Sequence, residues 1–246
     1  MRFGLLLVLG VAACGGVTVT DELAESSAAG GELRRGDVVT ILPQIGRVET
    51  PLVNDPNHVH LCTGTLVAPT VVLTAAHCVG YRAMDVGTEL ARFIIASEDG
   101  IVRAAKIDGS AIIGHEVGSD DLALLHLEET VDWLDPMPLR PGPPALGDVA
   151  TVYGYGRRDC RLGHPDEGEV DGHKRAYSFT WGQEPHAICG GDSGGPTLIE
   201  GQVTLITSGT WTLWGVLEAT EFAHVWAHYG WLISQIDAWA PSTDPI

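Results

Sequence analysis

The sequence has 246 residues, of which 45% are hydrophobic, so it can bury the core of one large domain or two small ones. Its 31 glycines and 14 prolines indicate many turns and therefore many short strands. The formal net charge of −18 argues against binding to nucleic acid, or to anionic lipid headgroups, through a basic patch.

Residues 1–13 predict a secretory signal peptide, because Arg2 precedes a short apolar run and then small residues. Val11 to Cys14 resembles a bacterial lipobox, in which the cysteine is lipidated and becomes the new N-terminus. An ordinary signal-peptidase site is the alternative. Five cysteines are an odd number, and removing Cys14 leaves four that can pair in an oxidising compartment. We therefore expect an exported protein, either a periplasmic or cell-surface lipoprotein attached through Cys14 or a secreted one.

Residues 14–36 are small, polar and acidic, which is typical of a flexible tether. The chain after them contains runs rich in β-branched residues, which predict strands. In the first half these runs lie at 38–42, 59–67, 71–74, 93–96, 102–107 and 122–127. Two of them adjoin polar motifs: Thr-Ala-Ala-His-Cys, which contains His77, and Asp-Leu-Ala-Leu-Leu, which begins at Asp121. The Pro-rich stretch 135–144 predicts the connection to a second half.

The second half predicts strands at 149–155, 196–199 and 203–208, and an exposed loop over 157–174. Residues 190–196 read Gly-Gly-Asp-Ser-Gly-Gly-Pro. Glycines allow a tight turn that exposes the Ser193 hydroxyl and lets backbone N–H groups converge near it. A nucleophile beside convergent donors suits acyl transfer, although a plain hairpin turn is the simpler interpretation of this heptapeptide alone. Near the end, Leu232, Ile236 and Trp239 form one apolar face of a helix.

The three motifs around His77, Asp121 and Ser193 resemble the catalytic signatures of the chymotrypsin/trypsin-like serine proteases, in the order of that family. The resemblance extends from about residue 37 to about residue 240. It implies an all-β fold of two six-stranded antiparallel barrels packed face to face, with a C-terminal helix and the active site between the barrels. A serine protease domain over residues 37–246 is expected, with the barrels meeting near 135–144.

The resemblance also implies residue roles. His77 would be the general base, Asp121 its orienting partner and Ser193 the nucleophile, with the backbone N–H groups of Gly191 and Ser193 as the oxyanion hole. The expected activity is that of a serine endopeptidase working through an acyl-enzyme, and its expected partner is a protein or peptide substrate. A catalytically inactive binding module of the same fold is the main alternative.

The expected specificity pocket contains five residues: Ala187, Ile188, Ser208, Thr210 and Thr220. Ala187 lies where trypsin-like members carry the Asp that binds Arg or Lys, so no such preference is expected. Thr210 and Thr220 would narrow the pocket, as in elastase-like members, and favour small or medium apolar side chains.

In most family members, cleavage of the chain releases a new N-terminus, and its ammonium group pairs with the Asp beside the catalytic Ser. The sequence lacks the usual Ile-Val-Gly-Gly terminus, and Gly36 after Arg34 and Arg35 is the nearest counterpart. Asp192 therefore needs a partner, because a buried unpaired carboxylate is costly. Either His60 or another group serves in an uncleaved chain, which we favour, or cleavage after Arg35 exposes Gly36.

The resemblance implies a disulfide between Cys62 and Cys78, and we expect Cys160 to pair with Cys189. No cofactor is expected, and no metal, because no histidines and acidic residues show a convincing zinc spacing. The protein is expected to be a monomer. The seven other histidines weighed as catalytic bases are expected at the surface or in local hydrogen bonds: His115, His126, His164, His173, His186, His224 and His228.

The sequence around Ser193 also fits Gly-x-Ser-x-Gly, the nucleophile motif of α/β-hydrolases. That fold requires a helix directly after the motif and an acid and a histidine later in the chain. Residues 196–199 predict a strand instead, which argues against this fold.

Overall fold

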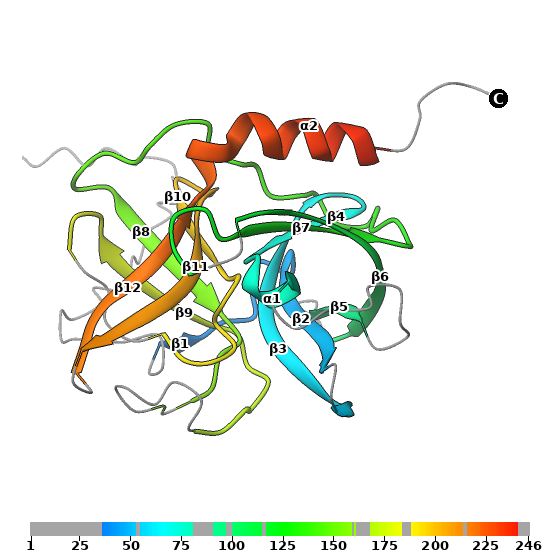
Figure 1. Ribbon diagram of the computed structural model, residues 1–246, viewed down its shortest axis with the longest axis horizontal. Helices are drawn as coiled ribbons and strands as arrows, with labels where there is room; N and C mark the ends of the chain where they lie inside the picture. The colour runs from blue at the N-terminus through cyan, green and yellow to red at the C-terminus, as the bar shows by residue number, and fades with distance from the viewer. Residues whose placement is uncertain are drawn as a thin grey trace, which may run out of the picture. The chain divides into compact units, whose positions relative to one another are not determined.

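Two antiparallel β-sheets of six strands each build this protein, and a helix follows them (Figure 1). The computed structural model describes residues 36–52, 55–80, 91–96, 100–114, 117–158, 160, 168–183, 188–213 and 216–240. Residues 31–246 form one compact unit. The expected fold class is confirmed: the protein is mostly β, with two six-stranded sheets and a short C-terminal helix.

The first sheet is a closed barrel with strand order β2-β3-β4-β7-β6-β5. Its strands are β2 (Ile45–Leu52), β3 (Asp55–Ala68), β4 (Val71–Thr74), β5 (Arg92–Ala96), β6 (Val102–Ile113) and β7 (Leu122–Leu127). The barrel closes where β2 pairs with β5. All four residues of β4 are buried, as is almost all of β7, because both strands are nearly continuous apolar runs. The short helix α1 (His77–Gly80) follows β4.

The second sheet has the strand order β1-β9-β8-β10-β11-β12. Its strands are β1 (Asp37–Val38), β8 (Val149–Gly154), β9 (Arg175–Thr180), β10 (Pro196–Ile199), β11 (Gln202–Leu213) and β12 (Val216–His224). The turn that carries Ser193 lies between β9 and β10. It is therefore fixed at its C-terminal end by a central strand of this sheet.

The segment between the halves packs back on the second sheet, where Leu139 forms a bridge with Val203 of β11. After β12, a 3-10 turn η2 (Val225–His228) leads into helix α2 (Tyr229–Trp239). The helix buries Leu232, and its last turn reaches the first barrel, where the Trp239 ring meets His126 of β7 edge-on at 5.4 Å. The helix thus packs against the first barrel although it follows the second sheet in the chain.

Two parts of the sequence behave differently from expectation. The strand expected over 38–42 is limited to β1, and the loop expected over 157–174 ends in a buried residue. Lys174 is 4% exposed because its ammonium donates to the carbonyl oxygens of Leu42 at 2.6 Å and Ile45 at 3.4 Å. This lysine ties β9 to the start of the first barrel.

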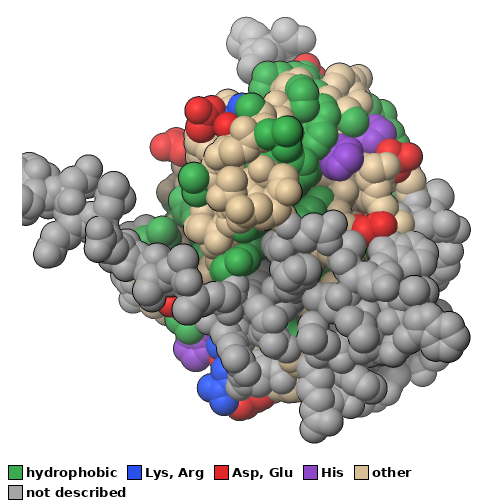
Figure 2. Space-filling model, turned by 90° about the vertical axis from the view of Figure 1, so that its left-hand side faces the viewer, with side chains coloured by type: hydrophobic (Ala, Val, Ile, Leu, Met, Phe, Trp, Pro, Cys, Tyr) green, Lys and Arg blue, Asp and Glu red, His purple; other side chains and the backbone are tan. Residues whose placement is uncertain are grey.

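No helix in the described ranges is both long and apolar enough to cross a bilayer. The acidic excess of the chain is visible at the surface, since acidic side chains occur at several separate places on the face drawn in Figure 2.

Candidate active site

Ser193 lies in a tight turn that hydrogen bonds hold from both halves of the fold. Its carbonyl oxygen accepts from the N–H of Thr63 in β3 at 2.8 Å. The next N–H, that of Gly194, donates to Thr207 in β11 at 2.8 Å. Gly194 has φ +81°, and a Cβ there would come within 2.1 Å of Thr74 Oγ1, so only glycine fits the turn. The sequence around Ser193 therefore specifies one rigid backbone conformation.

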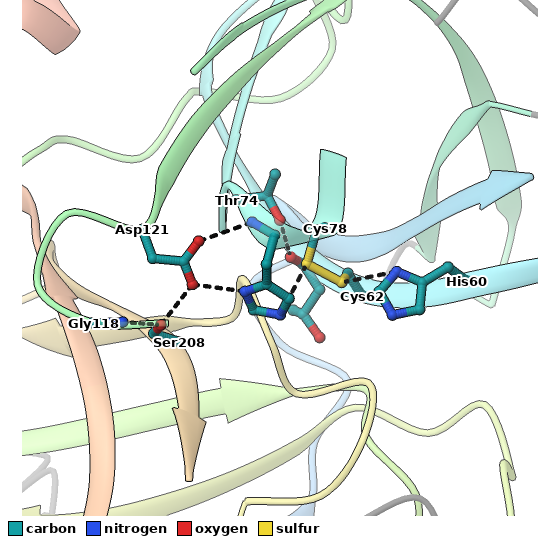
Figure 3. Close-up of polar contacts among 9 residues, drawn as sticks. His60, Cys62, Thr74, Cys78, Gly118, Asp121 and Ser208 are labelled. Carbon is teal, nitrogen blue, oxygen red and sulfur yellow. Dashed lines mark hydrogen bonds and ion pairs between the residues drawn. A yellow bond between two sulfur atoms is a disulfide. The ribbon is translucent and has the colours of Figure 1, made fainter. Parts of the chain in front are cut away.

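A histidine–carboxylate pair lies in the first barrel. His77 is the first residue of α1, and Asp121 directly precedes β7. The ring Nδ1 of His77 lies 2.6 Å from Asp121 Oδ2, and the backbone N–H of His77 donates to Asp121 Oδ1 at 2.8 Å (Figure 3). An ionised carboxylate only accepts, so the proton of a neutral His77 ring sits on Nδ1 and leaves Nε2 as the accepting nitrogen of the ring.

Asp121 has no exposed surface and receives a further hydrogen bond from the second sheet. The Ser208 hydroxyl of β11 donates to Asp121 Oδ2 at 2.5 Å and accepts from the N–H of Gly118 at 2.9 Å. The sequence predicted Ser208 as part of the specificity pocket, and no sequence pattern pointed to this contact. Ser208 thereby links the β11 backbone to the carboxylate that orients His77.

Both His77 and Ser193 line one cleft of about 520 Å³, together with Gly191. Asp121 is buried behind His77 rather than exposed in the cleft. A substrate in this cleft would therefore meet the imidazole and the hydroxyl, but not the carboxylate. The residues expected as base, nucleophile and oxyanion donor are brought together at one surface.

The backbone of Gly191 is fixed by a hydrogen bond to its carbonyl. Its oxygen accepts from the Thr63 hydroxyl at 2.8 Å, and its φ is +103°. In the described part of the chain, neither the N–H of Gly191 nor that of Ser193 has a protein acceptor. Two such amides beside a cleft can stabilise an oxyanion.

Asp192 is 2% exposed, and its carboxylate accepts from the N–H of Gly156 at 2.7 Å and of Cys189 at 2.8 Å. Gly154 and Gly156 lie so close that a Cβ on either would come within 2.4 Å of this carboxyl group. Burial raises the pKa of Asp192 to about 7, and the two N–H donors and the positive charge of Arg175 oppose that shift.

His60, the expected partner of Asp192, lines the cleft, and its Nδ1 lies 4.0 Å from the sulfur of Cys62 (Figure 3). Its role toward Asp192 stays a prediction. Arg175, which no sequence pattern singled out, is 5% exposed and lies opposite Gly154 in the β8–β9 pair. The Asp171 carboxylate holds its guanidinium.

Two disulfides flank the site. Cys62 bonds to Cys78, which joins β3 to α1, and Cys160 bonds to Cys189, three residues before Asp192. Cys62, His77 and Cys78 place potential ligand atoms within 4.8 Å of one another. Their sulfur atoms are bonded to each other, so this cluster does not offer thiolates to a metal.

Three residues of the expected specificity pocket line the cleft: Ile188, Ser208 and Thr210. Thr220 pairs with Thr210 across β11 and β12 but is not among the described residues that line the cleft. Ala187 lies outside the described residues. Val117 also lines the cleft. A Cβ on Gly209 would come within 2.5 Å of the Val117 side chain, so Val117 occupies the space beside that glycine.

Several other histidines have local acidic partners. Carboxylate oxygens lie 2.6 Å from His126 Nδ1, 3.4 Å from His173 Nδ1 and 2.9 Å from His228 Nε2. Burial lowers the pKa of His224, whose ring stacks on Trp226. None of these four histidines lines the described cleft. His115, His164 and His186 lie outside the described residues, as do Cys14 and the whole of residues 1–35.

The family model described as Trypsin matches residues 51–221, which is more than half of the chain. A mouse (Mus musculus) tryptase is 28% identical over 196 residues, covering 66% of this chain and 71% of the tryptase. The snake venom serine protease Haly-2 of Gloydius brevicauda is 26% identical over 217 residues, covering 76% of this chain and 82% of that protein.

Solved structures share the fold. Human heparin binding protein superimposes with a TM-score of 0.63 at 18% identity, covering 86% of this chain and 99% of that one. Neuropsin, a serine protease expressed in the limbic system of mouse brain, gives a TM-score of 0.62 at 18% identity, covering 82% of this chain and 98% of neuropsin.

Proposed function

This chain belongs to the trypsin family, and from that premise we propose that it is a serine endopeptidase that hydrolyses peptide bonds through an acyl-enzyme. The observation that carries the proposal is the 2.6 Å contact between His77 and the buried Asp121, with His77 opening on the same cleft as Ser193. The family implies protein or peptide substrates.

Ser193 is the proposed nucleophile, since a hydroxyl attacks a carbonyl only when a base removes its proton. The Nε2 of His77 takes that proton and later gives it to the departing amine. Asp121 keeps the other ring proton on Nδ1 and stabilises the imidazolium that forms. These roles are the established ones of the family, carried over to the matching residues.

The N–H groups of Gly191 and Ser193 are the proposed oxyanion hole. Their lack of a protein acceptor among the described residues supports this role, because unpaired donors are available to the developing charge. Thr63 supports the geometry because its hydroxyl holds the Gly191 carbonyl at 2.8 Å.

A preference for small or medium apolar side chains just before the scissile bond is also proposed. Ile188 is buried, Thr210 lines the cleft, and neither carries a charge that would attract Arg or Lys. A peptide-library cleavage profile dominated by Arg or Lys would overturn this preference.

We expect an active-site-directed fluorophosphonate to label Ser193 of the folded, processed protein. Labelling should disappear in Ser193→Ala and fall strongly in His77→Ala. The matched control is His126→Ala, which removes a histidine that also has a carboxylate at 2.6 Å but does not line the cleft. If the folded protein is not labelled, the inactive binding module is the better description.

The bacterial lipoprotein type remains part of the proposal, and it rests on Val11 to Cys14 in the sequence. We propose a monomer anchored through lipid on Cys14 in the periplasm or at the cell surface. The two disulfides support an extracellular or equally oxidising location. Metabolic labelling with a fatty-acid analogue should mark the wild-type chain and not Cys14→Ser. If the analogue marks neither form, the chain is not lipidated and simple secretion is the better description.

A further inference from the structure

The cleft has one uncharged end and one end that carries charge. At the first end, beside Gly209 of β11, lie Val117 and Thr210, neither of which is ionisable. At the other end, on β2 and beside the Gly190 backbone, lie Arg47 and Arg157, together with Glu49. In a chain with 14 basic and 32 acidic residues, two arginines at one end of the cleft run against the overall charge. They therefore mark this end as locally different from the rest of the surface.

The two arginines lie near the N-terminal side of the nucleophile turn, at Gly190 and Gly191. Arg157 donates its backbone N–H to the carbonyl of Gly190 at 3.0 Å. Arg47 lies opposite Thr63 in the β2–β3 pair, and Thr63 holds the Gly191 carbonyl. The opposite side of the turn is bound by β11 through Gly194 and Thr207. Since β11 carries the pocket proposed for the residue before the scissile bond, the arginines lie where the residues after that bond would run.

At the end of the cleft that contains Arg47 and Arg157, the positive charges outnumber the negative ones. Both oxygens of Glu49 are held at 2.9 Å, one by Arg47 and the other by Arg92. One carboxylate thus faces two guanidinium groups. The guanidinium of Arg157 donates to the neutral carbonyl of Gly168 at 3.1 Å, which leaves its charge uncompensated by that bond. A guanidinium presents several donors in one plane and suits a carboxylate.

We propose that the Arg47–Arg157 end of the cleft is a binding subsite for acidic side chains of the substrate on the leaving-group side of the scissile bond. The inference rests on the proposed peptidase function, which it deepens by naming a substrate class. Preferred substrates carry Asp or Glu in the first few residues after the bond, and Arg157 is the main specificity-determining residue.

Binding tests the subsite without turnover. The full chain with Ser193→Ala would be titrated with three labelled peptides that differ only in Glu, Gln or Lys at the second residue after the expected cleavage point. We expect the Glu peptide to bind about tenfold more tightly than the Lys peptide at low salt. Raising ionic strength to about 0.5 M should shrink that ratio because salt screens the attraction. Equal binding of the three peptides, or tighter binding of Lys, would overturn the subsite.

The responsible residue is identified by comparing ratios within each variant. Arg157→Gln should bring the Glu-to-Lys ratio toward one, whereas Arg157→Lys should keep most of it. Arg103→Gln is the matched control, because Arg103 lies 4.2 Å from the Trp133 ring centroid and does not line the described cleft. A Glu preference that survives Arg157→Gln unchanged would contradict the assignment.

Turnover measurements distinguish failure of the proposed subsite from failure of the proposed peptidase function. The same peptides, internally quenched, would be given to the chain with Ser193 intact, beside the fluorophosphonate assay. Labelling of Ser193 without any Glu preference in binding or kcat/KM refutes the subsite and leaves the peptidase. A Glu preference in binding without labelling or cleavage supports the subsite and refutes the peptidase.

Discussion

Ser208 shows how much a single hydroxyl can matter when it meets a buried charge. It donates to Asp121 at 2.5 Å, and Asp121 has no exposed surface on which water could replace it. Loss of a hydrogen bond to a buried charged group costs about 1.5–3 kcal/mol. The orientation of His77 depends on the same carboxylate.

We therefore expect Ser208→Ala to slow the reaction of Ser193 with a fluorophosphonate by about tenfold, since the carboxylate loses a donor that fixes its position. The labelling rate is the measurement, because a small reagent depends little on the substrate pocket. Ser208→Thr keeps a hydroxyl and should recover much of the rate. Ser178→Ala, an exposed strand position bonded to Thr151, is the control and should not change it. An unchanged rate in Ser208→Ala would contradict the role.

Asp192 makes stability depend on pH. Burial raises its pKa from 3.8 to about 7, so at pH values between these two the carboxyl group is protonated more often in the folded state than in the unfolded state. The free energy of unfolding that this group contributes is present below pH 3.8 and is lost as pH rises through about 7.

The expected result is that the difference in free energy of unfolding between wild type and Asp192→Asn falls as pH rises from about 4 to about 7. Urea unfolding at several pH values measures it. The same change at Asp132, whose side chain is exposed, is the control substitution. A difference for Asp192→Asn that stays flat over this range would show that burial does not raise this pKa.

At the scale of elements, each disulfide fixes a different part of the site. Cys62–Cys78 joins β3 to the helix that begins with His77. Cys160–Cys189 fixes the residues just before the turn of Gly191 and Ser193, and it spans 29 positions. A loop of this length predicts about 3–4 kcal/mol of stabilisation in the chain-entropy model.

Removing the second bridge with Cys160→Ser and Cys189→Ser should lower the free energy of unfolding by about 3 kcal/mol. It should also slow labelling of Ser193, since Cys189 donates its N–H to Asp192 at 2.8 Å and so helps to set the turn. Chemical unfolding and the labelling rate are the measurements. If stability falls and labelling is unchanged at a temperature where the variant is folded, the bridge supports the fold and not the turn.

The local sequence pattern predicted strands well where the buried residues are apolar, and less well where polar or charged residues are buried. The runs that became β4, β7 and β10 are wholly or almost wholly buried, so composition alone identifies them. β2 was missed because Arg47 and Glu49 interrupt its alternation. The buried carboxylate of Glu49 contacts Arg47 and, across the sheet, Arg92 of β5. Pairing partners that are distant in sequence leave no mark on a linear pattern.

The site divides in the same way. The motifs around His77, Asp121 and Ser193 are local and were recognised from residue order, and their roles remain predictions. Ser208, Arg47 and Arg157 belong to the site's surroundings through contacts between separate elements. Nothing near them in the sequence indicates those contacts, because β-strand pairing across the fold creates them.

At the scale of the whole molecule, both halves contribute to one reaction surface. The first barrel supplies His77 and Asp121, and the turn before β10 supplies Ser193. Hydrogen bonds from Ser208 to Asp121 and from Thr63 to Ser193 and Gly191 cross between the halves. Activity should therefore depend on the association of the halves as well as on the residues of each.

The segment before the first barrel is held against the second sheet. β1 pairs with β9 at Val38 and Arg175, the N–H of Val39 donates to Lys174 at 2.9 Å, and Lys174 donates to Leu42. Asp192 accepts two backbone N–H groups and experiences the positive charge of Arg175. A newly released terminal ammonium is not the only way to stabilise a carboxylate in these surroundings.

We expect the chain uncleaved after Arg35 to react with a fluorophosphonate, and the double change Arg34→Ala and Arg35→Ala to react at a similar rate. Mass spectrometry of the labelled protein identifies its first residue. Arg175→Met should slow labelling, because Asp192 then loses its nearby positive charge, whereas Arg140→Met, on the segment that joins the halves, should not. Label found only in chains that begin at Gly36, with the double variant inert, would show instead that cleavage supplies the missing partner.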